Sequence, residues 1–307
     1  MVAITRMFGG FGMVVLSLGL VGSSRAAENL PAPIKERTTI DIGMPGTLFQ
    51  GMPKWIITAG AEPFKKMMKE QTGLAGTIHF PTDALMLADQ MKEGKVQLGV
   101  FQGHEFAWAR NKNPDLMPIA VAVPMQPVQS FCLVKWDCKA KNIGDLKGEK
   151  ISLPPVHRDY CELFLARQKD LHMKGAKFAG QIDADVATNA IQDVIDDKAG
   201  CTIVDGATWH FFQKVFPGAA ENLKVLCESE VFPNACIAIQ KSELDDKTIE
   251  KFRKAMLNAQ NDTIGRPMLT TWKLTGFAKV PDNYEQQIKT IGKTYPVPPA
   301  LRVAVDK

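Results

Sequence analysis

Hydrophobic residues beyond position 38 alternate between short apolar runs and longer stretches in which apolar residues recur at helical spacing. Short runs predict β-strands, and the longer spacing predicts amphipathic helices. Pro63 predicts a break within the first helix, and Gly73 predicts its end. Alternation of strands and helices favours an α/β fold built on largely parallel sheets. The first series of predicted strands covers residues 39–43, 76–80, 96–101 and 117–123, and its helices cover 53–71, 82–93 and 104–111.

The same order of elements recurs in the second half of the chain. Residue 43 corresponds to residue 152 and residue 101 to residue 204, which are offsets of 109 and 103 positions, without sequence identity. The repeat therefore lies in the architecture, and it predicts two similar α/β lobes. Its predicted strands cover residues 150–153, 177–179, 201–205 and 223–227, and its helices cover 158–170, 183–198 and 207–215.

Two further apolar runs, residues 130–136 and 234–240, each follow a turn that contains proline and belong to neither series. They are predicted to carry the chain from one lobe to the other and back. Lobe one would comprise residues 27–126 plus 233–307, and lobe two residues 127–232. Helical patterns over residues 245–260 and 281–293 would complete lobe one. Two lobes joined by two hinge strands would enclose an interlobe cleft, which is the expected ligand site.

The N-terminal residues 1–26 have the pattern of a cleaved signal peptide. Arg6 precedes an apolar run over residues 8–21, and small residues lead to Ala26, where cleavage is expected. The run is too short to span a bilayer easily, although an uncleaved anchor helix is the alternative. No cysteine lies near the predicted cleavage position, so attachment of a lipid is not expected. The sequence thus predicts a periplasmic protein.

Composition narrows the class of protein and its partners. Of the 307 residues 45% are hydrophobic and 23% are charged, which excludes a disordered chain. A formal net charge of +4 without a basic run gives no support to nucleic-acid binding. Export makes at least one disulfide plausible within lobe two or across the crossing strands, and buried free thiols are the alternative. The six cysteines are Cys132, Cys138, Cys161, Cys201, Cys227 and Cys236.

Candidate binding residues follow from the rule that ligands of open α/β sheets lie beyond the carboxyl ends of the strands. Four loops occupy such positions, over residues 45–51, 102–106, 154–160 and 205–210. Histidines in such loops can instead be surface caps, and an acid there can cap the next helix. The candidate ligand-binding residues are Thr47, Gln50, Gln102, His104, Glu105, His157, Arg158, Asp159, Tyr160, Asp205, Trp209 and His210.

Two ligand chemistries are open at these loops. A small oxyanion or phosphonate-like acid could be held by Arg158, His157 and backbone amides. A metal ion or metal chelate could be held by the nitrogen and oxygen ligands of both lobes, although no HExxH or CxxC motif is present. No nucleophile accompanies the histidines and acids, so an enzyme is not expected, and no cofactor is indicated.

Four stretches of the sequence resemble a known family. They are MKEGKVQLGVFQGHEFAWA (91–109), IGDLKGEKISL (143–153), CTIVDG (201–206) and LCESEVFPNACIAI (226–239). This pattern is similar to the phosphonate-binding branch of type II periplasmic solute-binding proteins, which serve ATP-driven importers.

The resemblance implies a two-lobed fold, a monomer, and delivery of a small ligand to the membrane subunits of an ABC importer. Presentation of the ligand to a membrane sensor is the other role open to such a protein. In the family, an acid at the position of Asp205 meets the amine of the ligand. Residues 156–161 read VHRDYC where the family has hydroxyl residues that hold the phosphonate.

Overall fold

The computed structural model describes residues 38–50, 52–154, 158–241, 243–299 and 301. The predicted signal peptide and His157 lie outside these residues. Within the described part of the chain, no helix combines the length and the apolar character needed to cross a membrane.

The first sheet has six strands in the order β11-β4-β10-β3-β1-β2. Strand β1 pairs in parallel with β2 and β3, whereas β10 runs antiparallel between β3 and β4. Every strand predicted in the first series is present, with ends shifted by at most two residues. The strands are β1 (Thr39–Gly43), β2 (Ala75–His79), β3 (Leu98–Phe101), β4 (Leu116–Pro124), β10 (Cys236–Gln240) and β11 (Leu274–Ala278).

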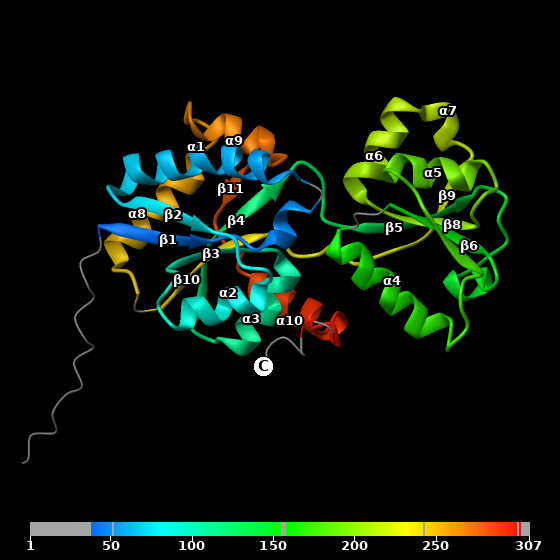
Figure 1. The fold of residues 1–307 in the computed structure, drawn as a ribbon, viewed down its shortest axis with the longest axis horizontal. Helices are drawn as coiled ribbons and strands as arrows, with labels where there is room; N and C mark the ends of the chain where they lie inside the picture. Colours follow the sequence, from blue (N-terminus) through cyan, green and yellow to red (C-terminus); the bar gives the residue numbers. More distant parts are fainter. Residues whose placement is uncertain (1–37, 51, 155–157, 242, 300, 302–307) are drawn as a thin grey trace, which may run out of the picture. The chain divides into compact units, whose positions relative to one another are not determined.

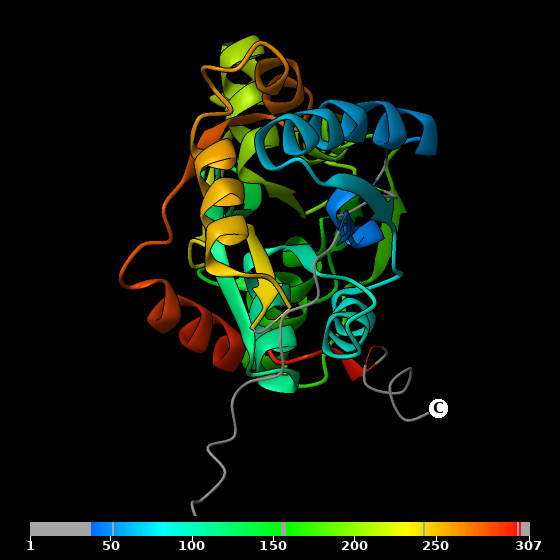
Figure 2. The same ribbon diagram turned by 90° about the vertical axis from the view of Figure 1, so that its left-hand side faces the viewer.

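Helices cover both faces of this sheet (Figures 1 and 2). Ile40 and Ile42 of β1 pack in a buried cluster with α1, α8 and α9, whereas α2, α3 and α10 pack on the opposite face. The C-terminal elements therefore complete the first sheet, as the return of the chain predicts. The helices are α1 (Lys54–Thr72), α2 (Ala84–Lys92), α3 (Gly103–Lys112), α8 (Asp246–Leu257), α9 (Gly265–Thr271) and α10 (Tyr284–Thr294).

Helix α1 differs from the prediction because it continues through Pro63. Proline removes one backbone donor, but the next turn buries Phe64, Met67 and Met68 against the sheet. Burial of three large apolar side chains outweighs the loss of one hydrogen bond. Gly73 ends the helix as predicted, in the left-handed conformation with a φ of 81°.

The second sheet has five strands in the order β7-β6-β8-β5-β9. Helix α4 covers one face, and α5 and α6 pack on the other through Ile191, Val194 and Phe212. The strands are β5 (Ser130–Lys135), β6 (Lys150–Leu153), β7 (Gly180–Asp183), β8 (Cys201–Asp205) and β9 (Leu223–Glu228), and the helices are α4 (Asp159–His172), α5 (Ala187–Ile195), α6 (Gly206–Val215) and α7 (Pro217–Ala220).

The two sheets repeat one topology, which confirms the predicted repeat. Reading β2-β1-β3-β10-β4 against β7-β6-β8-β5-β9 matches each strand with its counterpart. Strands β5 and β10 are the two apolar runs expected to cross between lobes, and each is an interior strand of the sheet that it enters.

The chain therefore crosses between the sheets in the segments that precede these two strands. The crossing segments lie side by side, because the Phe232 N–H donates to the Val128 carbonyl at 2.8 Å and the Ser229 N–H to the Ser130 carbonyl at 2.9 Å.

Some boundaries differ from the sequence prediction for local reasons. The strand expected at residues 177–179 forms at β7 instead, where Asp183 pairs with Leu153. Since Asp183 belongs to a strand, α5 begins only at Ala187 and is shorter than expected. Helices α7 and α9, strand β11 and two short 3₁₀ helices, η1 (Gly46–Phe49) and η2 (Ile143–Leu146), are additional to the predicted elements.

The predicted disulfide is absent, because all six cysteines are free thiols. Hydrogen bonds with Cys201 and Cys227, together with burial, raise the pKa of the Cys132 thiol. Burial likewise raises the pKa of Cys161 and Cys236. These three thiols are therefore kept in the protonated form, whereas the hydrogen bond with Cys132 lowers the pKa of Cys227.

Gly103 provides a test of the packing between α3 and the second crossing segment. A Cβ atom at this position would lie 2.0 Å from the carbonyl oxygen of Pro233. We expect Gly103→Ala to lower the free energy of unfolding by about 1–3 kcal/mol, because backbone must move to relieve the clash. Gly218→Ala is the control, since a Cβ there meets no atom within 4 Å. Urea unfolding should separate the two variants, and equal midpoints would contradict this packing.

Candidate functional site

Residues from both sheets meet where the ends of β1, β3 and β6 lead into helices. Thr47 and Gln50 belong to η1 and its end, His104 and Glu105 to the first turn of α3, and Asp159 begins α4. Each element follows the carboxyl end of its strand, which is where ligands bind in open α/β sheets. The structure therefore brings together five of the predicted binding residues.

Glu105 is a buried acid, only 2% exposed, in the first turn of α3. The Thr47 hydroxyl donates to its Oε1 at 2.5 Å, and the Gln102 backbone N–H donates to its Oε2 at 3.1 Å. Burial raises the pKa of Glu105 to about 7, and the charges of Asp159 and Asp83 add to the rise while the two hydrogen bonds oppose it. An uncompensated carboxylate at this position is costly near neutral pH.

His104 is a buried neutral imidazole, 1% exposed. Its ring meets the edges of Trp108 and Phe232, with centroid distances of 5.1 and 5.6 Å. Burial lowers its pKa to about 3, so that the ring carries no charge near neutral pH. Its Nε2 atom has no hydrogen-bond partner within the described part of the chain. A buried nitrogen without a partner is unusual in proteins and points to a group that it could bind.

Asp159 connects the second sheet to this cluster. Its Oδ1 accepts a hydrogen bond from the Gln50 amide Nε2, and burial raises the pKa of the carboxyl group. One ring nitrogen of His104 and one carboxylate oxygen each of Glu105 and Asp159 lie within 4.8 Å of one another. Two acids and an imidazole at this spacing could hold a cation, either an ammonium group or a metal ion.

Arg158 and Tyr160 flank Asp159. Arg158 immediately precedes α4, and the ion pair with Glu162 that the sequence allows is not among the contacts of the described residues. Tyr160 is buried, with its ring centroid 5.5 Å from that of Phe232. Burial raises the pKa of the Tyr160 phenol, so the ring acts as a neutral wall beside the cluster.

The candidates on α6 have local structural contacts. Asp205 caps the helix, accepting from the Thr208 N–H at 2.9 Å and the Thr208 hydroxyl at 2.8 Å. Trp209 is buried and stacks on Phe212 with a centroid distance of 6.4 Å. His210 bonds through Nδ1 to the Gly206 carbonyl at 2.7 Å. These contacts give the three residues local structural roles, and their contact with a ligand stays a prediction.

Phe232 is a residue of the site that the sequence prediction omits. It is 1% exposed and touches His104, Tyr160 and Tyr295, the last at a centroid distance of 4.8 Å. Its position directly before Pro233, at the predicted return crossing, was the available signal. An aromatic side chain in a crossing segment can contact residues of both lobes, because the segment lies next to both.

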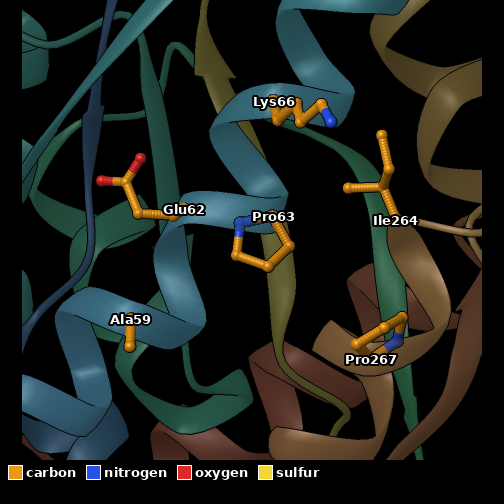
Figure 3. A pocket seen from close by; sticks show the side chains of 6 residues that line it. All are labelled: Ala59, Glu62, Pro63, Lys66, Ile264 and Pro267. Atoms are coloured by element: carbon orange, nitrogen blue, oxygen red, sulfur yellow. The ribbon is translucent and has the colours of Figure 1, made fainter.

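A groove of about 410 Å³ lies elsewhere, between α1 and the region of α9 (Figure 3). It lies on the helical layer of the first sheet and not at the strand ends. Its lining includes none of the predicted binding residues, and it consists of Ala59, Glu62, Pro63, Lys66, Ile264 and Pro267.

Comparison with known proteins identifies the family. A family model described as "ABC transporter, phosphonate, periplasmic substrate-binding protein" matches residues 56–284, which is most of the chain. The chain belongs to this family. It is therefore a periplasmic ligand-binding receptor for an ABC importer and not an enzyme. No curated protein matches the sequence.

Solved structures show the same fold at low sequence identity. A Xanthomonas citri protein solved with ATP is 14% identical with a TM-score of 0.60, covering 84% of this chain and 97% of that one. A Prochlorococcus marinus protein in complex with methylphosphonate is 15% identical, with a TM-score of 0.57 and coverage of 83% and 97%. The binding-protein component of a Pseudomonas aeruginosa phosphonate transporter is 16% identical, with a TM-score of 0.55 and coverage of 84% and 88%. Identity at this level supports the fold, not a shared ligand.

The raised pKa of Glu105 predicts a pH-dependent stability. A carboxyl group whose folded pKa lies above its unfolded value contributes stability below pH 4.5, and this contribution is lost as the pH rises through about 7. Glu105→Gln removes the titrating group. We expect the difference in free energy of unfolding, variant minus wild type, to rise by up to about 3 kcal/mol between pH 4.5 and pH 8. Urea unfolding in metal-free buffer measures the difference, and an offset that is constant with pH would contradict the assignment.

Proposed function

We propose that this receptor captures a small acid that also carries a positive charge, at the cluster formed by Thr47, Gln50, His104, Glu105 and Asp159 with Arg158. The acidic end of the ligand would face Arg158, and the positive charge would face the two carboxyl groups. The observation that carries this proposal is the proximity of the Glu105 and Asp159 carboxylates beside an arginine.

The arginine supports the acidic end of the ligand. No ion pair or hydrogen bond of the Arg158 guanidinium occurs among the described residues, so its donors are available to an oxyanion. Arg158 also stands at the N-terminus of a helix of 14 residues, where anions are stabilised. An arginine at this position can form two parallel hydrogen bonds with a carboxylate, phosphonate or sulfonate group.

The carboxyl groups support the positive charge. A simple oxyanion bound beside Arg158 would also lie near Glu105 and Asp159, whose charges oppose it. A ligand with its own cationic group converts that repulsion into attraction. The description of the family as phosphonate-binding fits an acidic ligand. Within that class of ligands, the acidic cluster favours acids that bring a positive charge.

Thermal-shift measurements with matched pairs of ligands test the proposal. In chelator-treated protein, we expect 2-aminoethylphosphonate to raise the Tm more than ethylphosphonate, and taurine more than ethanesulfonate. A ligand concentration of about a hundred times the Kd adds roughly 3 kcal/mol to the free energy of unfolding, which raises the Tm by about 5 °C. Arg158→Ala should abolish the shift, whereas the exposed Arg266→Ala on α9 should retain it. A larger shift with the unaminated partner of each pair would contradict the ligand assignment.

We further propose that residues 1–26 are removed during export without lipid attachment and that the mature receptor is a monomer. The pattern of basic, apolar and small residues before Ala26 supports cleavage at that position. The intact mass of protein recovered from the periplasm should correspond to a chain that begins at Ala27, and sedimentation should give the mass of one chain. A retained leader or a dimer would contradict these two points separately.

A further inference from the structure

The cluster at the start of α3 and α4 has the composition of a transition-metal site. It offers one imidazole and two carboxylates, with ligand atoms mutually within 4.8 Å. Zinc and its first-row neighbours bind such mixed nitrogen and oxygen sets, whereas magnesium and calcium favour oxygen alone. Neither carboxylate is bonded to a lysine or arginine within the described residues, and the charge of the neighbouring Arg158 acts on Asp159 without a bond between them.

Two buried polar atoms without partners among the described residues also indicate that a further group binds at this cluster. His104 Nε2 and Gln50 Oε1 are both buried and lack a hydrogen-bond partner within the described chain. His104 is 1% exposed, so water does not compensate its nitrogen freely. An unpaired buried polar atom destabilises the folded state, because it has lost its hydrogen bonds to water. A bound metal ion is an electron-pair acceptor for the imidazole nitrogen, and it can also take an amide oxygen.

The ligands are already oriented by neighbouring groups, as metal ligands usually are. Thr47 and the Gln102 N–H hold the two oxygens of Glu105, and the Gln50 amide holds one oxygen of Asp159. The His104 ring is fixed between Trp108 and Phe232. Each held oxygen retains a second lone pair, so these bonds orient the carboxylates without exhausting them.

From this geometry we infer that His104, Glu105 and Asp159 bind a divalent transition-metal ion, and that the receptor takes its small acid as a complex with that metal. The inference rests on the proposed function and specifies it, because the acid would bring its positive charge as a bound metal ion, and an ammonium group would take the same position only when no metal is bound. Three protein ligands leave a coordination position open, as in catalytic zinc sites, and an acid bound to Arg158 could occupy it. An ammonium group could donate to both carboxylates and to the imidazole nitrogen as well, so direct titration with metal is what distinguishes the two cations.

Titration of metal into chelator-treated protein tests the inference. We expect one Zn²⁺ per chain by calorimetry, and visible d–d absorption when Co²⁺ is bound in place of zinc. Asp159→Asn and Glu105→Gln keep the shape of each side chain and should each weaken zinc binding at least tenfold. Glu162→Gln is the matched control, because it removes an acid in the same turn of α4 that is outside the cluster, and it should change the affinity less than twofold.

The outcomes separate this inference from the proposed function. Absence of zinc binding by wild type overturns the metal site, as does equal weakening by Glu162→Gln and Asp159→Asn. If 2-aminoethylphosphonate raises the Tm fully in chelator and zinc does not bind, the proposed function stands and the metal inference fails. If zinc binds with the expected variant pattern but no acid shifts the Tm with or without zinc, the metal site stands and the acid-binding proposal fails.

Discussion

Burial of a carboxyl group and an imidazole at the start of α3 is the constraint around which the site is arranged. Glu105 and His104 are removed from water, which is costly for a charged group and for any unpaired polar atom. The loop after β1 offsets part of that cost, because the Thr47 hydroxyl donates a hydrogen bond to Glu105. The loop can do so because the N–H groups of Met44 and Gly46 donate to the carbonyls of His79 and Pro81, which fix η1 beside α3.

The repeat of the two sheets places a second helix start in the corresponding position, with a different result. Helix α3 follows β3, and α6 follows its counterpart β8. Each helix start has an acid that accepts a backbone N–H: Glu105 within the first turn of α3, and Asp205 at the N-cap of α6. Asp205 satisfies its oxygens locally through Thr208, whereas Glu105 turns toward Thr47 and Asp159. The same architectural position thus serves as a cap in one sheet and as part of a polar cluster in the other.

Much of this organisation could be predicted from the sequence, because it depends on local patterns. Strands β1, β6 and β8 have the bounds that the apolar runs predict, and Gly73 ends α1. The continuity of α1 through Pro63 could not be predicted, since it depends on burial against a sheet formed by distant residues.

The site, too, has one part that local patterns predict and one part that depends on tertiary contacts. Strand ends identified Glu105 and Asp159 as candidates, but only the tertiary structure shows that they meet. Asp205, Trp209 and His210 instead make local contacts around α6. Phe232 was missed because its one sequence signal, the position before Pro233 at the return crossing, indicates a turn and not a contact with His104 and Tyr160.

Charge balance then determines what such a site can discriminate. At about 5 Å and an effective dielectric constant of about 20, two full unit charges interact by about 3 kcal/mol, and Glu105 contributes the part of its charge that it retains near its pKa of about 7. Asp159 and Glu162 already occupy the first turn of α4, so the attraction of that helix end for an anion depends largely on Arg158. In the proposed receptor, an inorganic oxyanion would gain the arginine but meet the repulsion of Glu105 and Asp159. A ligand with its own positive charge gains both interactions. The acids that make the site costly to bury thus select against simple oxyanions, which are competing solutes of similar size and shape.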